Sequence, residues 1–230
     1  MTAQAGGASL ISREHFLKTN RRCSPFNSLM PATTAITPIR NKLRNELRQR
    51  RRALSVPSKQ FASKRITQLL MRSGWLRHGQ RIAIYLATEE ELDLAPLINQ
   101  AWRRGCQLFA PHIINAHRRE MKFYPFNAQS PLITHRWGMQ QLAHPGTPIA
   151  TRMLDAVLIP TVGFDSAGHR LGMGGGFYDR HFMQWRRVQP NKPALIGVAY
   201  TCQEISAIDV QPHDIQLDAI LTEQALTWFR

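Results

Sequence analysis

An apolar stretch, LDAVLIPTVGF at residues 154–164, leads through a glycine-rich loop into FYDRHFMQWRR at 177–187. The first segment is rich in branched and aromatic side chains, which predicts a buried strand, and the second segment is predicted to be a helix. A strand that leads into a helix is typical of a parallel sheet, because parallel neighbours need a long crossover connection. This feature favours an α/β fold.

The same alternation recurs along the chain. LAPLINQAWRRG at 94–105 predicts a helix that ends at Gly105, between two predicted strands, so that the three segments form a βαβ unit. We therefore expect an α/β fold, a layered sandwich with a mainly parallel central sheet flanked by helices. The further predicted strands are RIAIYLA (81–87), CQLFAPHI (106–113), MKFYPF (121–126), PALIGVAY (193–200) and DAILT (218–222).

Two amphipathic helices are predicted before the first strand. The first has Thr37 as its N-cap and Pro38 at its first helical position. Its apolar stripe consists of Ile39, Leu43, Leu47 and Leu54. The second helix, PSKQFASKRITQLLMRS at 57–73, has Ser58 or Ser55 near its cap. Its apolar residues are Phe61, Ile66, Leu69 and Leu70.

Residues 1–36 have no amphipathic period and are rich in Ala, Ser, Thr and Asn. We expect a disordered N-terminal extension at 1–36 and a single α/β domain at 37–230. A transit peptide, or translation from an upstream start with Met30 nearer the functional one, would each account for this composition.

Thirty basic and 15 acidic residues give the chain a net charge of +15, of which residues 1–52 contribute +9 (11 Lys and Arg against two Glu). Such a segment suits a solvated helix face, a nucleic acid or other polyanion, or a phosphorylated or acidic ligand. Three cysteines without a CxxC pair argue against a disulfide framework or a zinc ribbon and favour a reducing, cytoplasmic compartment. No apolar run approaches the ~20 residues that a membrane span needs.

The loop RLGMGGGFYDR at 170–180 follows a predicted strand and precedes a predicted helix, which is where α/β sheets bind ligands. Glycines let the backbone approach phosphate oxygens, and a helix N-terminus supplies unpaired amides. Arg170 adds a planar cation, and Asp179 is a candidate magnesium ligand. The loop matches neither the P-loop pattern nor the G-x-G-x-x-G dinucleotide pattern.

The longer segment LIPTVGFDSAGHRLGMGGGFYDRHF resembles the signature of the 5-formyltetrahydrofolate cyclo-ligase family, also called methenyltetrahydrofolate synthetases. Every fixed position of that signature is met from Pro160 to Arg180, and the resemblance covers most of residues 37–222. It implies an α/β sandwich that converts 5-formyltetrahydrofolate to 5,10-methenyltetrahydrofolate and releases ADP and phosphate. The implied route is phosphorylation of the formyl oxygen by ATP and attack by N10, without a protein nucleophile.

The resemblance also implies a set of site residues. Arg170 is expected to position phosphate, and Mg²⁺ is expected on Asp179 and Asp214, with Asp218 as a weaker alternative. The expected folate-binding residues are Leu86, Glu91, Trp137 and Phe177, with Glu90 as the rival of Glu91. The expected ATP-binding residues are Arg40, Arg44, Arg170, Leu171, Gly172, Met173, Gly174, Gly175, Gly176, Phe177 and Tyr178.

Two other hypotheses stay open at this point. A nucleic-acid-binding protein would use the basic first helix, but this hypothesis leaves the loop at 160–180 unexplained. A paralogue could retain the nucleotide loop with an altered folate pocket, because the match is weakest around Trp137. The resemblance to the cyclo-ligase family, by contrast, implies a protein that binds ATP and 5-formyltetrahydrofolate. We expect it to be a monomer, with neither nucleic acid nor a membrane as a partner.

Overall fold

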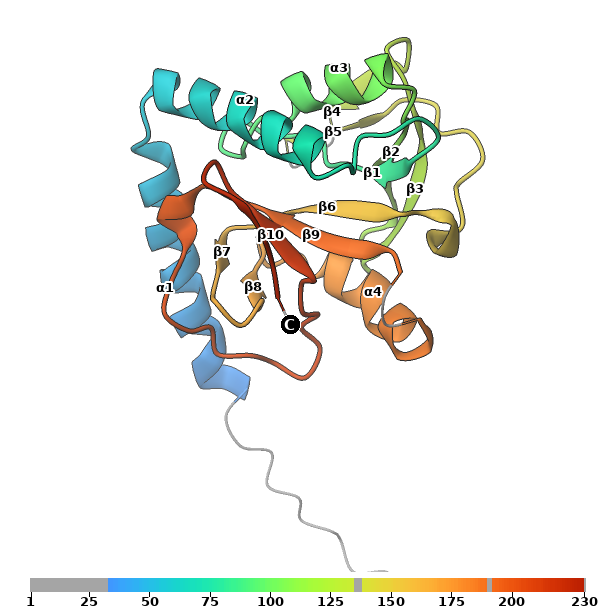
Figure 1. Ribbon diagram of the computed structural model, residues 1–230. Coiled ribbons are helices and arrows are strands. Elements are labelled where there is room, and N and C mark those ends of the chain that lie inside the picture. Colours follow the sequence, from blue (N-terminus) through green and yellow to red (C-terminus); the bar gives the residue numbers. More distant parts are fainter. Residues whose placement is uncertain (1–32, 135–137, 190–191, 230) are drawn as a thin grey trace, which may run out of the picture. The chain divides into compact units, whose positions relative to one another are not determined.

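The computed structural model describes residues 33–134, 138–189 and 192–229 (Figure 1). Within these ranges seven strands form one sheet, in the order β11-β10-β9-β6-β1-β2-β3. The strands are β1 (Arg81–Ala83), β2 (Gln107–Asn115), β3 (Glu120–Phe126), β6 (Ala156–Pro160), β9 (Ala194–Val198), β10 (Ala219–Leu221) and β11 (Leu226–Trp228). The helices are α1 (Thr33–Arg52), α2 (Val56–Arg72), α3 (Ala95–Arg103) and α4 (Phe177–Val188).

The five inner strands β10, β9, β6, β1 and β2 are parallel, and β11 and β3 pair antiparallel at the two edges. The prediction of an α/β fold with a mainly parallel sheet is confirmed. β1 pairs with β2 on one side and with β6 on the other. Strands after β1 are therefore placed first on one side of it and then, from β6 onward, on the other side, so the strand order reverses between β1 and β6. In open α/β sheets this reversal opens a crevice beyond the carboxyl ends of the two strands, and ligands bind there.

Helices cover both faces of the sheet: α2 and α3 lie on one face and α4 on the other (Figure 1). Neighbouring residues of β1 pack on opposite faces of the sheet, because side chains alternate along a strand. Ile82 belongs to the apolar cluster that contains Leu70 and Leu97, whereas Ala83 belongs to the cluster around Phe182. None of the described helices is long and apolar enough to cross a membrane.

The first helix occupies a third position, beside a small hairpin that follows β6 (Figure 1). The hairpin consists of β7 (Gly163–Phe164) and β8 (Arg170–Leu171). Leu47 of α1 is fully buried in a separate cluster with Val162, Leu171 and Ile208. A Cβ at Gly163 would overlap the Leu47 side chain, so this glycine allows the helix to pack closely.

Sequence reasoning placed the start of the first helix wrongly. The helix begins at Thr33, and Pro38 lies inside it rather than at its first position. Proline gives up only the hydrogen bond to the carbonyl of residue 34, in an exposed part of the helix, so it does not set the boundary here. Residues 1–32, which contain most of the predicted extension, lie outside the described residues.

The apolar stripes were also only partly right. Ile39 is 66% exposed and Phe61 is 62% exposed, whereas Leu47, Ile66 and Leu70 are buried as predicted. The inward face of α1 instead carries buried Arg40 and Arg51. Ser55, rather than Ser58, caps α2, because the Ser55 hydroxyl accepts the Ser58 amide at 3.3 Å. The first strand ends at Ala83 instead of residue 87.

Short elements were missed. The β7–β8 hairpin, the edge strand β11, and a second hairpin of β4 (Leu132–Thr134) with β5 (Gln140–Leu142) have no counterpart in the sequence-based prediction. Strands of two or three residues are too short to show a period of two. The 3₁₀ turns η1 (Thr151–Met153) and η2 (Thr201–Gln203) were likewise not predicted.

Leu47→Ala should lower the free energy of unfolding by about 2–5 kcal/mol, because it empties the centre of the cluster that docks α1. Ile39→Ala is the matched control on the same helix and should change it by less than about 0.5 kcal/mol, because Ile39 faces solvent. Urea unfolding of both variants measures the difference. Equal losses would mean that α1 does not depend on this cluster.

Candidate active site

Two loops leave the sheet at its point of reversal. The glycine loop, Gly172–Gly176, follows the β7–β8 hairpin and ends where α4 begins. The acidic loop, Thr88–Asp93, follows β1. Both loops contact arginines of α1, so one helix borders the two parts of the candidate site.

The glycine loop has the backbone that the sequence predicted for an anion site. Gly174 and Gly176 have φ angles of 97° and 66°, which residues other than glycine rarely adopt. Gly176 is the N-cap of α4 and has no side chain to pair with the first helical amides. No capping side chain therefore occupies the positive end of the α4 dipole, which favours an anion there.

Arg44 joins α1 to the glycine loop. Its Nε atom donates to the carbonyl of Gly172 at 2.9 Å, and its guanidinium carbon lies 3.6 Å from where a Cβ of Gly174 would be. Burial, and then the charge of Arg40, lower the pKa of the Arg44 guanidinium. A cation that is partly desolvated and close to another cation favours the approach of an anionic ligand.

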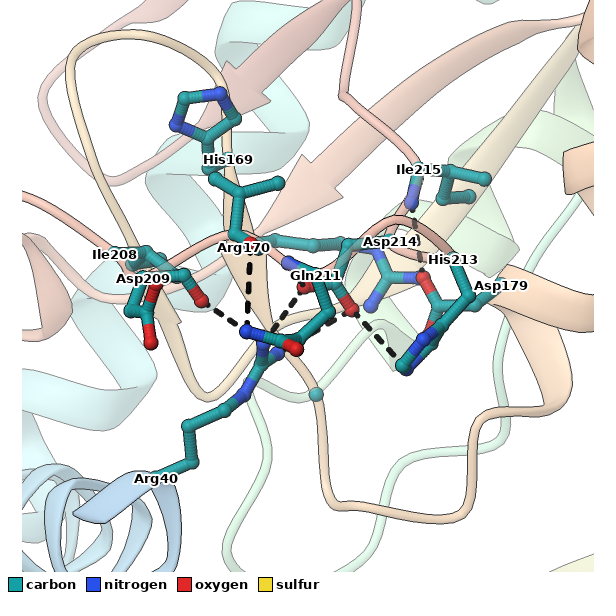
Figure 2. A network of polar contacts seen from close by, with 12 residues as sticks. Arg40, His169, Arg170, Asp179, Ile208, Asp209, Gln211, His213, Asp214 and Ile215 are labelled. Atoms are coloured by element: carbon teal, nitrogen blue, oxygen red, sulfur yellow. Dashed lines mark hydrogen bonds and ion pairs between the residues drawn. The ribbon is translucent and has the colours of Figure 1, made fainter. Parts of the chain in front are cut away.

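Arg40 binds a different segment, near the C-terminal end of the domain. Its guanidinium donates to the Asp214 carboxylate at 2.7 and 3.3 Å and to the carbonyl of Asp209 at 3.0 Å (Figure 2). The Gln211 amide also donates to Asp214, at 2.9 Å. Asp214 is thereby fixed beside α1.

Asp179 is held from two sides. Arg170 donates to its Oδ1 atom at 2.7 Å, and the amide of Ile215 donates to the same atom at 3.2 Å (Figure 2). Because Ile215 follows Asp214 directly, the two predicted magnesium ligands come from adjoining segments. The Arg170 side chain is only 3% exposed. Its Nε atom is buried without a hydrogen-bond partner among the described residues.

The two aspartates of the candidate site suit a Mg²⁺ ion that also binds phosphate. Among the described residues, no group of three or more His, Cys, Asp or Glu side chains could hold a metal ion. Asp179 and Asp214 offer two carboxylates, each already neutralised by an arginine. Mg²⁺ commonly takes one or two carboxylates and completes its shell with water and substrate phosphates, so the pair suits a metal that arrives with a phosphate.

The acidic loop contains two neighbouring glutamates that point to different partners. Glu90 accepts hydrogen bonds from three arginines of α1: Arg48 at 2.9 and 3.0 Å, Arg51 at 2.9 Å and Arg52 at 2.8 Å. The hydrogen bonds from Arg48, and then those from Arg52 and Arg51, outweigh the effect of burial and lower the pKa of Glu90 to about 2. Glu90 is fully engaged within the protein.

Glu91 lines a cavity of about 400 Å³ between the acidic loop and α2. Its Oε2 atom accepts the amide and hydroxyl of Thr88, at 2.9 and 3.1 Å. Its Oε1 atom has no hydrogen bond within the part of the chain that the structure describes. Burial, and then the charge of Glu91, raise the pKa of Tyr178, which lies in the first turn of α4.

The residues that the sequence offered as alternatives lie in different surroundings. Of the two glutamates, Glu91 faces the cavity and Glu90 does not. Of the two late aspartates, Asp214 lies near the glycine loop, whereas Asp218 binds Arg186 and the amide of Leu195 at the amino end of β9.

The remaining predicted residues are placed as follows. The Leu171 side chain is buried in the Leu47 cluster, so only its backbone could meet a ligand. Met173 is 51% exposed on the glycine loop. Leu86 packs against the core beside α2 and α3, and Phe177 is half-buried with its ring close to Gly175. Trp137 lies outside the described residues.

Sequence reasoning missed the contacts of Arg48 and Arg51 with Glu90. The arginines were visible as a basic run, and Glu90 as one of three consecutive acids. A helical run of arginines together with a separate acidic run was the available signal, but nothing in the sequence alone pairs the two.

Comparisons with known proteins give both sequence relatives and a matching family model. A model of the 5-formyltetrahydrofolate cyclo-ligase family matches residues 36–223. The 5-formyltetrahydrofolate cyclo-ligase of Escherichia coli strain K12 is 33% identical over 177 residues, which is 76% of this chain and 96% of that protein. The enzyme of that name from Mus musculus is 28% identical over 202 residues, 84% of this chain and 98% of that protein.

Solved structures give the same fold. The 5,10-methenyltetrahydrofolate synthetase of Aquifex aeolicus superposes with a TM-score of 0.69 at 24% identity, covering 84% of this chain and 93% of that chain. The synthetase of Mycoplasma pneumoniae superposes with a TM-score of 0.62 at 25% identity, covering 80% of this chain and 98% of that chain.

Glu90→Gln should lower the free energy of unfolding at pH 7, because ionised Glu90 is stabilised by three arginines. The lowered pKa corresponds to about 3 kcal/mol. The exposure of Arg48 and Arg52 reduces the expected loss to about 1–2 kcal/mol. Because the folded pKa is lowered from 4.5 to about 2, the difference from the parent should shrink as the pH falls through this interval.

Urea unfolding of parent and variant between pH 7 and pH 3 measures this difference. Glu89→Gln is the control, because Glu89 is exposed and has no ion pair among the described residues. A gap between Glu90→Gln and the parent that stays constant over this pH range would contradict an ionic origin.

Proposed function

This chain belongs to the 5-formyltetrahydrofolate cyclo-ligase family, and we propose that it converts 5-formyltetrahydrofolate to 5,10-methenyltetrahydrofolate with hydrolysis of ATP to ADP and phosphate. One observation carries the proposal: arginines of α1 contact both a glycine loop with two arginine–aspartate pairs beside it and the acidic loop, whose Glu91 presents an unpaired oxygen to a cavity. The two parts follow the strands between which α/β sheets bind ligands.

The proposed reaction has two stages. The formyl oxygen attacks the terminal phosphorus of ATP, ADP leaves, and the formyl carbon becomes activated by a phosphate leaving group. N10 then attacks this carbon and loses its proton, and the C–O bond breaks to release phosphate. Every bond is made between the substrates, so the protein has to align them and balance charge rather than supply a nucleophile.

On the nucleotide side, the proposed ligands are the backbone of the glycine loop and the guanidinium of Arg44. The Nε atom of Arg44 donates to the Gly172 carbonyl and its Nη1 atom donates to Asn41 Oδ1 at 2.6 Å, which leaves its Nη2 atom to meet phosphate oxygens. Arg40 and Arg170 act indirectly, because they donate hydrogen bonds that orient Asp214 and Asp179. The backbone from Leu171 to Tyr178, including Met173 and Gly175, lines this side.

Asp179 and Asp214 would hold Mg²⁺ together with the nucleotide phosphates. When bound, the ion would neutralise charge on the phosphate oxygens during transfer. Arg40 and Arg170 fix the positions of these two carboxylates before the nucleotide arrives.

On the folate side, Glu91 would accept the parallel ring and amino hydrogens of the pterin. Thr88 orients its carboxylate from one side and leaves the other oxygen for the substrate. Leu86, Phe177 and Trp137 are proposed to line the rest of the folate site.

Arginine pairing in α1 argues against a nucleic-acid-binding function. Arg40, Arg48 and Arg51 point into the protein and pair with carboxylates, so the helix does not offer its full charge to an outside polyanion. We further propose that residues 37–230 act as one domain, that the first 36 residues are dispensable, and that the protein is a cytoplasmic monomer.

The purified protein, mixed with Mg-ATP and 5-formyltetrahydrofolate, should produce the absorbance of the methenyl product. Glu91→Gln should raise the KM for the folate by about tenfold or more, because a charged acceptor is lost, and should leave the KM for ATP near the parental value. Glu46→Gln, at an exposed glutamate of α1 that does not line this cavity, is the control and should match the parent. Absence of product from the folded parent protein would reject the proposed function.

Arg44→Ala should raise the KM for ATP roughly ten- to a hundredfold, which corresponds to one lost charged hydrogen bond. The KM for the folate should change much less. Lys42→Ala removes an exposed charge from the same helix and is the control. Steady-state kinetics with each substrate varied in turn measure both KM values. Equal changes in the two KM values would mean that Arg44 has a purely structural role.

A further inference from the structure

A second cavity, of about 440 Å³, lies beside α4. It is bordered by the turn between β2 and β3 and by the first turns of α4. Three of its lining residues are arginines, and we name it the arginine pocket after Arg118, Arg119 and Arg180. Neither the proposed mechanism nor the sequence-based prediction uses these residues.

Arg119 has an unusual backbone. Its φ angle is 53°, and among the described residues it is the only non-glycine residue with a positive φ. A branched or long side chain adopts this conformation at a cost, and residues of this kind gather at functional sites. Nothing in the sequence reveals such a conformation in advance.

This backbone directs Arg119 to the glycine loop. Its Nη1 atom lies 3.1 Å from where a Cβ of Gly176 would be. Gly176 is the N-cap of α4 and also has a positive φ, so its missing side chain both permits the turn and leaves room for the guanidinium. Arg44 approaches the same loop at Gly174, so the loop has a cation at each of these two glycines.

The pocket carries positive charge that the protein does not neutralise. None of Arg118, Arg119 and Arg180 forms an ion pair with a carboxylate in the described ranges, although Glu120 also lines the pocket. The His181 ring bonds to Thr151, and burial lowers its pKa, so it adds no charge near pH 7. The arginines of α1 at positions 40, 48 and 51, by contrast, are all paired with aspartate or glutamate.

We infer that the arginine pocket is a second phosphate-binding subsite and that Arg119 is its contact residue. Arg119 connects this subsite to Gly176, the N-cap of α4, where the positive end of the helix dipole favours phosphate oxygens. The inference rests on the proposed function for its natural sources, which are a phosphate of the nucleotide or the phosphate released by the reaction.

The folate carboxylates are a less suitable occupant of this pocket. The cavity that contains Glu91 has two lysines of its own, Lys59 and Lys64, in its lining. Those ammonium groups can take the carboxylates of a ligand whose pterin meets Glu91. The arginine pocket instead contains Arg119, which lies beside Gly176 of the glycine loop, and this position favours the phosphate chemistry.

The test uses Arg119→Asn in the full-length protein. Asparagine removes the charge and tolerates a positive φ better than alanine, so the turn is preserved. Calorimetry should show about tenfold weaker binding of ADP and of an imido analogue of ATP, as expected for the loss of one charged contact. Arg119→Lys should recover part of the loss. Arg103→Asn, at an exposed arginine at the end of α3, should bind like the parent.

Separate titrations with inorganic phosphate identify the source. Equal weakening for ADP and phosphate supports a subsite for the released phosphate, and weakening for the nucleotides alone supports a subsite for a nucleotide phosphate. Unchanged nucleotide and phosphate binding, or a loss confined to 5-formyltetrahydrofolate, would overturn the inference. The proposed function is judged separately, by product formation in the parent, and survives either of these negative outcomes.

Discussion

The contacts between the arginines of α1 and the carboxylates of the domain are the interactions on which the site depends. The apolar cluster around Leu47 is small, and much of the inward face of α1 is cationic. Arg51 is almost completely buried and bonds to Glu90, while Arg40 reaches Asp214. Removing one partner of such a pair leaves a desolvated charge, which costs far more than the pair contributes when intact. The helix is therefore docked in one orientation.

This docking links the two halves of the site. The N-terminal part of α1 binds the glycine loop through Arg44, and its C-terminal part binds the acidic loop through Arg48, Arg51 and Arg52. A displacement of the helix that moves one loop also acts on the other. Two substrates that must meet with atomic accuracy are thus positioned against one rigid element rather than against two independently moving loops.

The parts of the structure that depend on local interactions could be predicted from the sequence. The strands at 106–113 and 193–200 were found within two residues, because strands buried in a parallel sheet are continuous apolar runs. The glycine loop was found because its chemistry lies in one segment. Pairing between Arg51 and Glu90, 39 residues apart, and the backbone of Arg119 depend on tertiary contacts, so no pattern in the sequence indicated them. Ile39 and Phe61 follow a helical period yet remain exposed for the same reason.

Glu90 and Glu91 show how neighbouring identical side chains acquire opposite roles. Glu90 turns to α1, where three guanidiniums satisfy its oxygens and lower its pKa to about 2. Glu91 turns to the cavity, where Thr88 satisfies one oxygen and leaves the other without a protein donor in the described chain. An acceptor that a cavity partly removes from water gains most from a ligand that donates to it. The fixed position of Glu90 anchors the loop from one side, so Glu91 can offer that oxygen without the loop collapsing onto it.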